Sequence, residues 1–311
     1  MRALVATERG AAAALADRPE PTGTVLTGLW SSLNYKDALA IAGRPGVLRS
    51  LPLVPGIDVV GRDADGAVLV VTGAGLGERV DGGLAERVAI DFGTAVPVPS
   101  AFSPQQAAAI GTAGVTAALS VLALERAGIP DGPVLVTGAG GGVGGFAVAL
   151  LAAGGRAVHA STGRAETLGE HLRALGATEV VGRLPAEPGR PLQTAQYAGV
   201  IDSVGGGALV NAIAQTVPGG TVAACGLAGS PDLPGTVLPF ILRGVTLTGI
   251  FSVDLAIERR REAWQLLADR IGGDVVDRMT DRTVGLEAAL DGADDVLAGH
   301  VRGRIVVDLQ R

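Results

Sequence analysis

Residues 133–145 read Pro-Val-Leu-Val-Thr-Gly-Ala-Gly-Gly-Gly-Val-Gly-Gly, and the apolar, alanine-rich run 146–154 follows them directly. The run 134–137 is short, apolar and β-rich, which predicts a strand buried on both faces. The glycines allow a tight turn and leave no side chains between the backbone and a ligand. A helix that begins there presents unpaired N–H groups and the positive end of its dipole to a phosphate. The stretch therefore predicts a dinucleotide-binding strand, turn and helix.

The register of the glycine motif is open. One register uses Gly140, Gly142 and Gly145, and a variant uses Ala139, Gly141 and Gly144. No Lys-Ser or Lys-Thr pair follows the glycines, so the motif does not indicate a nucleoside-triphosphate P-loop.

Composition limits the classes of protein that this chain can belong to. With 311 residues, 48% apolar and 18% charged, it can hold two globular domains and a substantial core. The net charge of −6 argues against nucleic acid as the main partner. A single cysteine, Cys225, excludes a disulfide framework and a thiolate-rich zinc site, and the three histidines are scattered without metal-ligand spacing.

The chain carries no pattern that directs it to a membrane. Its N-terminus lacks the charged, then apolar, then cleavable order of a signal peptide. No uninterrupted apolar run reaches the roughly 20 residues that a membrane span requires. We therefore expect a soluble, cytoplasmic protein with no membrane partner.

The order of expected elements changes near residue 134. Before it, short strands separated by glycine turns are expected at 1–7, 24–33, 57–62, 67–72 and 84–90, with a helix over 107–127 that is interrupted near 111–114. After it, strands at 134–137, 156–161, 179–182, 198–202, 220–225 and 244–250 are expected, with helices at 143–153, 165–175 and 206–215 between the earlier ones. This rhythm predicts a doubly wound parallel sheet. Helices at 258–271 and 285–297 and a strand at 303–309 close the chain.

We expect the β-rich N-terminal part and the last ~60 residues to form one domain into which the nucleotide fold is inserted. The expected bounds are 1–112 with 252–311 for the β domain, and 113–251 for the nucleotide domain.

The end of the second nucleotide-domain strand indicates which dinucleotide binds. An NAD-type fold places a carboxylate there to accept hydrogen bonds from the adenosine ribose. Here the residues are Ser161, Thr162, Gly163 and Arg164. A carboxylate would repel a 2′-phosphate, whereas Arg164 can bind one with charge-assisted hydrogen bonds. The alternative is that Ser161 and Thr162 cap the next helix and Arg164 is solvated; the two readings are compatible and together favour NADPH.

Motifs along the whole chain resemble the medium-chain dehydrogenase/reductase superfamily. They are Ser31-Ser-Leu-Asn-Tyr-Lys-Asp, Pro55-Gly-Ile-Asp, Gly82-Gly-Leu-Ala-Glu, Ile110-Gly-Thr-Ala-Gly, Val136-Thr-Gly-Ala-Gly-Gly-Gly-Val-Gly, Ile201-Asp-Ser-Val-Gly, Ala224-Cys-Gly-Leu-Ala-Gly and Leu238-Pro-Phe-Ile-Leu-Arg-Gly-Val. Their combination is similar to the zinc-independent quinone-oxidoreductase-like group, specifically its acryloyl-CoA reductase branch. Two stretches depart from the family pattern, Glu78-Arg79-Val80-Asp81 and Phe251, and both bear on the substrate pocket.

The resemblance implies a GroES-like, mainly-β catalytic domain, a Rossmann domain, NADPH as cofactor and a homodimer. The reaction it implies is reduction of the carbon–carbon double bond of acryloyl-CoA to propanoyl-CoA. With Ser161, the candidate cofactor residues are Tyr35, Gly140, Gly141, Gly142, Val143, Gly144, Thr162, Gly163, Arg164, Ser203, Ile250 and Arg304.

Tyr35 and Asn34 are the candidate catalytic residues for this reaction. Tyr35 is the best donor of a hydrogen bond or proton, because a neutral phenol is a donor at working pH; alternatively it only positions the nicotinamide or packs in the core. Asn34 either orients a ligand or only ends its strand. We expect Lys36 and Asp37 to form a local ion pair, and Asp58, after a Pro-Gly turn, to brace the fold.

A coenzyme A substrate requires cationic residues near its phosphates. The candidates are Arg44, Arg49 and the helix start Glu258-Arg259-Arg260-Arg261. Two other functions stay open: reduction of a quinone or enone by NADPH, and a non-catalytic NADPH-binding sensor.

Overall fold

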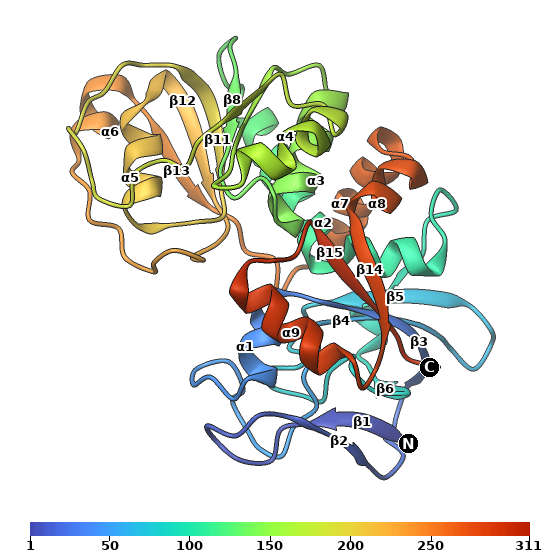
Figure 1. Cartoon of the computed structure of the whole chain (residues 1–311). Coiled ribbons are helices and arrows are strands. Elements are labelled where there is room, and N and C mark those ends of the chain that lie inside the picture. Colours follow the sequence, from blue (N-terminus) through green and yellow to red (C-terminus); the bar gives the residue numbers. More distant parts are fainter. The chain divides into compact units, whose positions relative to one another are not determined.

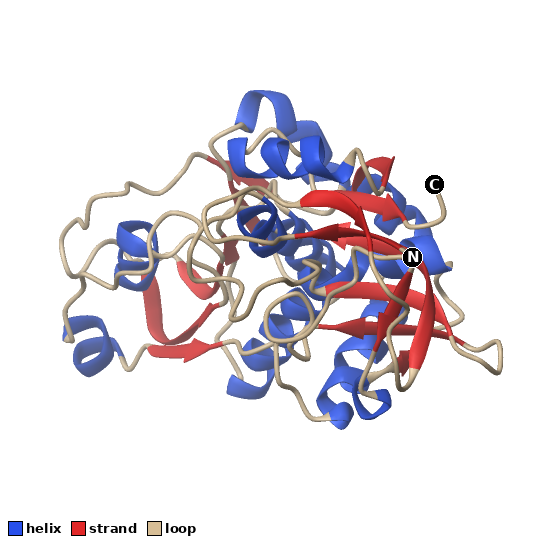
Figure 2. Ribbon diagram, turned by 90° about the horizontal axis from the view of Figure 1, so that it is seen from below, coloured by secondary structure: helices blue, strands red, loops and turns tan.

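The computed structural model describes all residues from 1 to 311 and contains two compact units (Figure 1). Unit 1 comprises Met1–Val115, Ser252–Ala268 and Gly272–Arg311, and unit 2 comprises Thr116–Phe251 with Asp269–Ile271. The first boundary thus follows Val115 rather than Thr112. Both ends of the chain belong to unit 1, and Figure 2 shows them beside its strands.

Unit 1 is built on a seven-stranded mixed sheet in the order β14-β15-β3-β4-β5-β7, with β6 paired to β3. The strands are β3 (Val25–Leu33), β4 (Asp58–Arg62), β5 (Val68–Thr72), β6 (Arg87–Ala89), β7 (Val96–Pro97), β14 (Thr280–Gly285) and β15 (Arg304–Asp308). Only β14 and β15 pair in parallel; the other pairs are antiparallel. A separate hairpin joins β1 (Arg2–Val5) to β2 (Ala14–Asp17). This is the mainly-β domain that the sequence predicts.

The C-terminal segment completes the core of unit 1. Strand β15 pairs with β3, so that Ile305 faces Leu33 across the sheet. Helix α9 (Ala289–Ala298) packs against α1 (Tyr35–Ile41) and β3, where a Cβ on Gly292 would lie 2.9 Å from Leu33 Cδ1 (Figure 1). Unit 1 also contains most of α7 (Ile257–Arg270), α8 (Gly273–Met279) and the 3-10 turn η1 (Phe92–Thr94).

Unit 2 contains a six-stranded sheet in which every pair is parallel, in the order β10-β9-β8-β11-β12-β13. Its strands are β8 (Val134–Val136), β9 (Val158–Ser161), β10 (Glu179–Val181), β11 (Tyr197–Asp202), β12 (Thr216–Ala224) and β13 (Thr246–Gly249); its helices are α3 (Gly142–Ala153), α4 (Ala165–Ala174), α5 (Gly206–Ala214) and α6 (Leu238–Arg243). The order reverses between β8 and β11, which is the switch point of a doubly wound sheet. The predicted Rossmann fold is therefore present.

Helix α2 (Pro104–Ala127) begins in unit 1 and ends in unit 2. Gly111, at φ 45° and ψ −153°, kinks it where the sequence predicts an interruption. By length and composition α2 could cross a membrane, but 83% of its most apolar window is buried, as in the core helix of a globular protein.

The sequence prediction missed short elements. These are β2, β7, α6, α8, β14 and the 3-10 turn η1, and the helix expected over 285–297 occupies 289–298. Strand β14 is defined by its pairing with β15, and no local pattern in 280–285 specifies that partner.

Candidate active site

The glycine turn after β8 is packed so closely that two positions require glycine. Gly138 has φ 61°, and a Cβ there would clash with the hydroxyl of Ser203. A Cβ on Gly144 would lie 2.6 Å from Ala139 Cα and would also clash with the carbonyl oxygen of Gly138. These contacts fix α3 tightly against the turn.

Gly141 lies in a different environment. It is exposed, caps α3 with φ −93° and ψ 178°, and a Cβ there would meet only Gly138 O, at 3.4 Å. The backbone does not need glycine at this position, so the open space at the helix N-terminus is available to a phosphate. The close packing at Gly144 and the open space at Gly141 favour the variant register, Ala139, Gly141 and Gly144.

Asp202 braces the neighbouring switch point. Its buried carboxylate accepts hydrogen bonds from Thr137 Oγ1 at 2.6 Å and from Gly205 N at 2.7 Å, and burial raises its pKa. Ser203 follows it at the end of β11, where Ser203 Oγ donates to the carbonyl of Thr137 at 3.1 Å. This hydrogen bond holds Ser203, a candidate cofactor residue from the sequence, beside the glycine turn.

Two hydroxyls at the end of β9 serve the fold. Ser161 Oγ donates to the carbonyl of Gly182 at 2.9 Å, and Thr162 Oγ1 accepts from the backbone N–H of Arg164 at 3.2 Å. Both side chains are buried. The guanidinium of half-buried Arg164 extends over the glycine turn, since a Cβ on Gly140 would lie 3.4 Å from Arg164 Nη2.

A second guanidinium, that of Arg183, lies at the same place and was missed by the sequence analysis. A Cβ on Gly163 would lie 2.7 Å from Arg183 Cζ, so the exposed Arg183 side chain crosses directly over that residue. Arg183 follows β10, which pairs in parallel with β9, so the ends of both strands meet at one edge. The sequence signal that could have identified Arg183 is its position just after β10, the strand that follows β9 along the chain.

The remaining unit 2 candidates lie at the start of α3 and after β13. Gly142 and Val143 are half-exposed in the first turn of α3. Ile250 is half-exposed after β13 and its N–H donates to the carbonyl of Ala224 at 2.9 Å.

In unit 1, Tyr35 is the first residue of α1 and its side chain is 43% exposed. Asn34, the N-cap residue, is buried, and its Nδ2 donates to Asp58 Oδ2 at 2.7 Å and to Asp37 Oδ2 at 3.0 Å. The amide protons of Asn34 are thus used inside the fold. The exposed Tyr35 side chain is accessible to a ligand, whereas the hydrogen bonds of Asn34 stabilise the start of α1.

Asp58 is the centre of a buried polar cluster. It accepts from Ser32 Oγ at 2.9 Å and from Thr112 N at 2.9 Å, and Thr112 Oγ1 lies 2.5 Å from its second oxygen. Arg304 Nη2 lies 3.6 Å from Asp58 Oδ2. Asp58 therefore braces the fold, as the Pro-Gly turn before it predicts.

Arg304 is also buried, and its guanidinium points inward. It donates to Ala109 O at 2.9 Å, Leu33 O at 3.0 Å and Ser32 Oγ at 2.7 Å. Burial lowers its pKa, and the charge of Asp58 opposes this effect. Arg304 therefore neutralises the buried carboxylate of Asp58, and because its guanidinium is buried it presents no exposed donor to a cofactor.

The expected ion pair between Lys36 and Asp37 is wrong. Lys36 Nζ lies 2.5 Å from Glu78 Oε2, because α1 directs the two neighbouring side chains away from each other. Asp37 is buried and accepts from the N–H groups of Asn34 and Ile57, each at 2.9 Å. Burial, and then the nearby charge of Asp58, raise the pKa of Asp37 to about 6.

The arginines suggested for coenzyme A phosphates differ in their surroundings. Arg49 pairs with Glu78 at 3.5 Å and Arg259 with Glu262 at 2.5 Å. Arg260 is buried and donates to Thr72 and Val253, so it is not available to a ligand.

The two stretches that depart from the family pattern also differ. Within 78–81, Glu78 and Arg79 form ion pairs and Asp81 accepts from Val54 N at 2.8 Å, so this stretch ties unit 1 together. Phe251 is 61% exposed.

Comparisons with known proteins agree with this geometry over the whole chain. The probable acrylyl-CoA reductase AcuI of Escherichia coli (strain K12) is 43% identical over 298 residues, 92% of this chain and 91% of the relative. This chain belongs to the medium-chain dehydrogenase/reductase superfamily. Within it, the chain is a member of the quinone-oxidoreductase-like group and its acryloyl-CoA reductase branch.

Further relatives of this reductase fit the same family. The yhdH oxidoreductase of Salmonella enterica, solved in complex with NADP, superposes with a TM-score of 0.94 at 42% identity, covering 99% of both chains. The putative quinone oxidoreductase YhfP of Bacillus subtilis (strain 168) is 40% identical over 299 residues, 92% of this chain and 90% of that protein. The structure of B. subtilis yhfP, with NAD bound, superposes with a TM-score of 0.91 at 37% identity over 99% of both chains.

Residues 142–269 match a family model described as "Zinc-binding dehydrogenase", yet the side chains of this chain offer no zinc site. No group of three or more His, Cys, Asp or Glu residues that could hold a metal ion is present. The thiol of Cys225 donates to the carbonyl of Asp202 at 3.1 Å, and burial raises its pKa to about 12. A cysteine binds zinc only as a thiolate, so neither Cys225 nor the other residues present fit a zinc ion.

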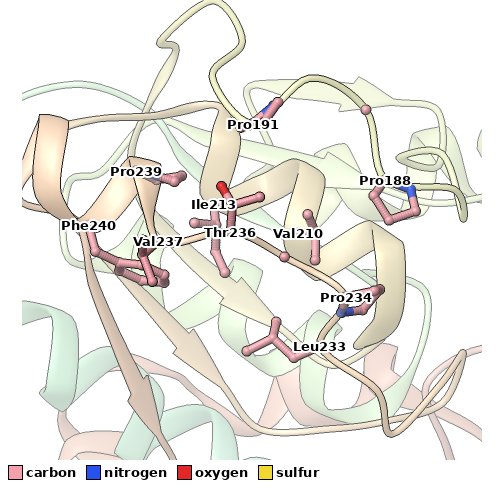
Figure 3. Close-up of a pocket in the computed structure, with 12 residues that line it drawn as sticks. Pro188, Pro191, Val210, Ile213, Leu233, Pro234, Thr236, Val237, Pro239 and Phe240 are labelled. Carbon is pink, nitrogen blue, oxygen red and sulfur yellow. The ribbon is translucent and has the colours of Figure 1, made fainter.

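Unit 2 has an apolar pocket between α5, α6 and the loops that lead to them (Figure 3). Val210 and Ile213 of α5 face Leu233 and Phe240 across it. None of its lining residues is titratable. The pocket therefore has no group that could take part in hydride or proton transfer.

Proposed function

We propose that this protein is an NADPH-dependent reductase of the carbon–carbon double bond of an enoyl-CoA thioester, and that its substrate is acryloyl-CoA, which it converts to propanoyl-CoA. The observation that carries the proposal is the pair of arginines at the ends of β9 and β10, in a chain that matches the E. coli acrylyl-CoA reductase along nearly its whole length. Those arginines fit a cofactor with a 2′-phosphate.

The cofactor site consists of backbone and cations in unit 2. The N–H groups of Gly142 and Val143 at the start of α3 bind the pyrophosphate, next to Gly141, whose own N–H donates to Gly138 O at 3.0 Å. The 2′-phosphate lies between the guanidinium groups of Arg164 and Arg183, which flank the Thr162–Gly163 backbone. Ser203 and Ile250, at the carboxyl ends of β11 and β13, complete the candidate contacts.

The bound cofactor supplies a hydride to the β-carbon of the thioester. Tyr35 supplies the hydrogen bond or proton, because it is the exposed phenol of unit 1 and its helix is anchored by Asn34 and Asp58. Asn34 and Arg304 act as positioning residues, since all their described contacts lie inside unit 1. Unit 1 is thus the catalytic domain and unit 2 the NADPH-binding domain.

We propose that the protein acts as a homodimer in the cytoplasm. Strand β13 is an open edge of the unit 2 sheet, and unpaired strand edges favour pairing with another chain. The nearby side chains of Val237, Ile241 and Leu242 are 65%, 69% and 62% exposed. A symmetric contact between two copies would cover both the edge and these apolar residues. The net charge of −6 continues to argue against nucleic acid.

The second candidate is NADPH-dependent reduction of a quinone or enone. The relative named as a putative quinone oxidoreductase, YhfP, favours it. This reaction needs the same cofactor but no contact with phosphates of the substrate. A non-catalytic sensor would bind NADPH without turnover.

Purified protein should be assayed for NADPH oxidation with acryloyl-CoA, crotonyl-CoA and a simple quinone in parallel. We expect acryloyl-CoA to give the highest kcat/KM. A preference for the quinone would replace the first proposal by the second. NADPH binding without turnover on any substrate would support the sensor.

A further inference from the structure

A small cavity in unit 1 brings together two turns that are distant in sequence. One is the turn after β1, which contributes Glu8 and Arg9; the other follows α1 and contributes Gly43 and Arg44. Both arginines are exposed at the surface of the molecule. Two exposed arginines thus line the same cavity of unit 1.

The contact between these turns is built into the backbone. Gly43 has φ 67°, and a Cβ there would lie 2.7 Å from the carbonyl carbon of Ala11, so no other residue allows the approach. Ala13 N donates to Ile41 O at 2.7 Å, and Arg44 N donates to Leu39 O at 2.9 Å. The two turns that carry Arg9 and Arg44 are therefore held together by the fold.

The local charge is positive. Several exposed arginines of unit 1 lie against carboxylates, as Arg2 does with Glu86 at 2.7 Å and Arg79 with Asp254 at 2.5 Å. Arg9 and Arg44 form no ion pair in the structure, and Glu8 is the single acid among the residues that line their cavity. Two guanidinium groups against one carboxylate favour an anionic ligand, and the planar fork of arginine matches a phosphate monoester.

The cavity and the candidate catalytic residue Tyr35 lie at opposite ends of helix α1. Helix α1 begins at Tyr35 and ends at Ile41, so its seven residues span about 10 Å. Tyr35 lies at the start of this helix and Arg44 just after its end. An extended coenzyme A thioester has its reactive acyl group at one end and its 3′-phosphate at the other.

We propose that Arg9 and Arg44 bind the 3′-phosphate of a coenzyme A substrate, an inference that rests on the proposed function. They form a substrate-specificity site in unit 1 that distinguishes coenzyme A thioesters from the same acyl group on a shorter carrier.

The test compares Arg9→Ala, Arg44→Ala and the double variant with the unchanged protein on three thioesters: acryloyl-CoA, acryloyl-3′-dephospho-CoA and acryloyl-pantetheine. We expect each single substitution to raise KM for acryloyl-CoA about 10-fold, the loss of one charge-assisted contact. KM for the two substrates without the 3′-phosphate should stay unchanged, as should kcat. Arg62→Ala is the matched control, because Arg62 is an exposed arginine of unit 1 that lies outside the cavity.

Equilibrium binding of free coenzyme A and 3′-dephospho-CoA separates this inference from the proposed function. If the unchanged protein does not reduce acryloyl-CoA, the proposed reaction is refuted. If the double variant nevertheless binds coenzyme A more weakly than the unchanged protein, the phosphate site is still supported. Equal affinity of the unchanged protein for the two ligands would overturn the phosphate site. Equal affinity of the double variant and the unchanged protein for coenzyme A would do the same.

Discussion

Substituting alanine for Gly141 and for Gly144 should separate cofactor binding from folding. Both residues belong to the glycine turn, three positions apart, and each substitution adds one methyl group. At Gly144 the methyl would lie 2.6 Å from Ala139 Cα in a buried position. At Gly141 it would meet only Gly138 O, at 3.4 Å, and would otherwise occupy open space at the start of α3.

The structure sets the size of each effect. Overpacking at Gly144 should cost about 1–3 kcal/mol of stability, and each kcal/mol lowers the melting temperature of a domain of 150–250 residues by about 2–4 °C. Gly141→Ala should cost less than about 1 kcal/mol, because only the preference for glycine over alanine at an N-cap is lost. Its methyl displaces the pyrophosphate from an N–H group, and losing one charge-assisted hydrogen bond, about 1.5–3 kcal/mol, weakens NADPH binding about 10- to 100-fold.

Thermal unfolding of the cofactor-free proteins and fluorescence titration with NADPH measure the two effects independently. We expect Gly144→Ala to lower the melting temperature by several degrees, and Gly141→Ala to leave it nearly unchanged while weakening NADPH binding. Wild-type NADPH affinity in Gly141→Ala would refute the assignment of Gly141 to the phosphate site. Equal melting temperatures for the two variants would refute the overpacking expected at Gly144.

Three further outcomes follow from the described contacts. Arg164→Ala and Arg183→Ala should each weaken NADPH binding about 10-fold and leave NADH binding unchanged; equal losses for both cofactors in a titration would contradict the 2′-phosphate site. Tyr35→Phe should lower kcat about 100-fold with little change in KM for NADPH, and an unchanged steady-state kcat would assign Tyr35 to positioning alone. The raised pKa of Asp37, about 6 against the ordinary value of 3.8, means that the folded protein holds this proton at pH values where the unfolded chain has lost it. Its contribution to stability should therefore fall as pH rises from about 4 to about 6, and urea unfolding should show this slope in the wild type but not in Asp37→Asn.

The nucleotide-binding half of the fold could be predicted from local sequence patterns. Alternating apolar strands and helices after residue 134 predict the parallel sheet. The turn 138–144 is glycine-rich because Gly138 has a positive φ and Gly144 lies too close to the backbone of Ala139 for a side chain. The absence of a carboxylate from 161–164 is likewise visible in the chain. Each of these signals depends on neighbours in sequence.

The partners of charged side chains could not be predicted in this way. Lys36 pairs with Glu78 and not with the adjacent Asp37, because α1 directs successive side chains to different faces. Arg183 joins Arg164 only because β10 pairs in parallel with β9. In both cases the distance along the chain says nothing about the distance in space.

The sequence by itself determined the two-domain class, the dinucleotide turn and the family, since strand and helix periodicity and glycine conformation are local properties of the chain. Only the tertiary structure decided which polar groups meet. The buried cluster on Asp58 draws Ser32 and Asn34, Thr112, and Arg304 from three separate segments. A buried carboxylate is stable only when donors and a counter-charge surround it, and the packing of strands and helices, not the order of residues, determines which side chains can supply them.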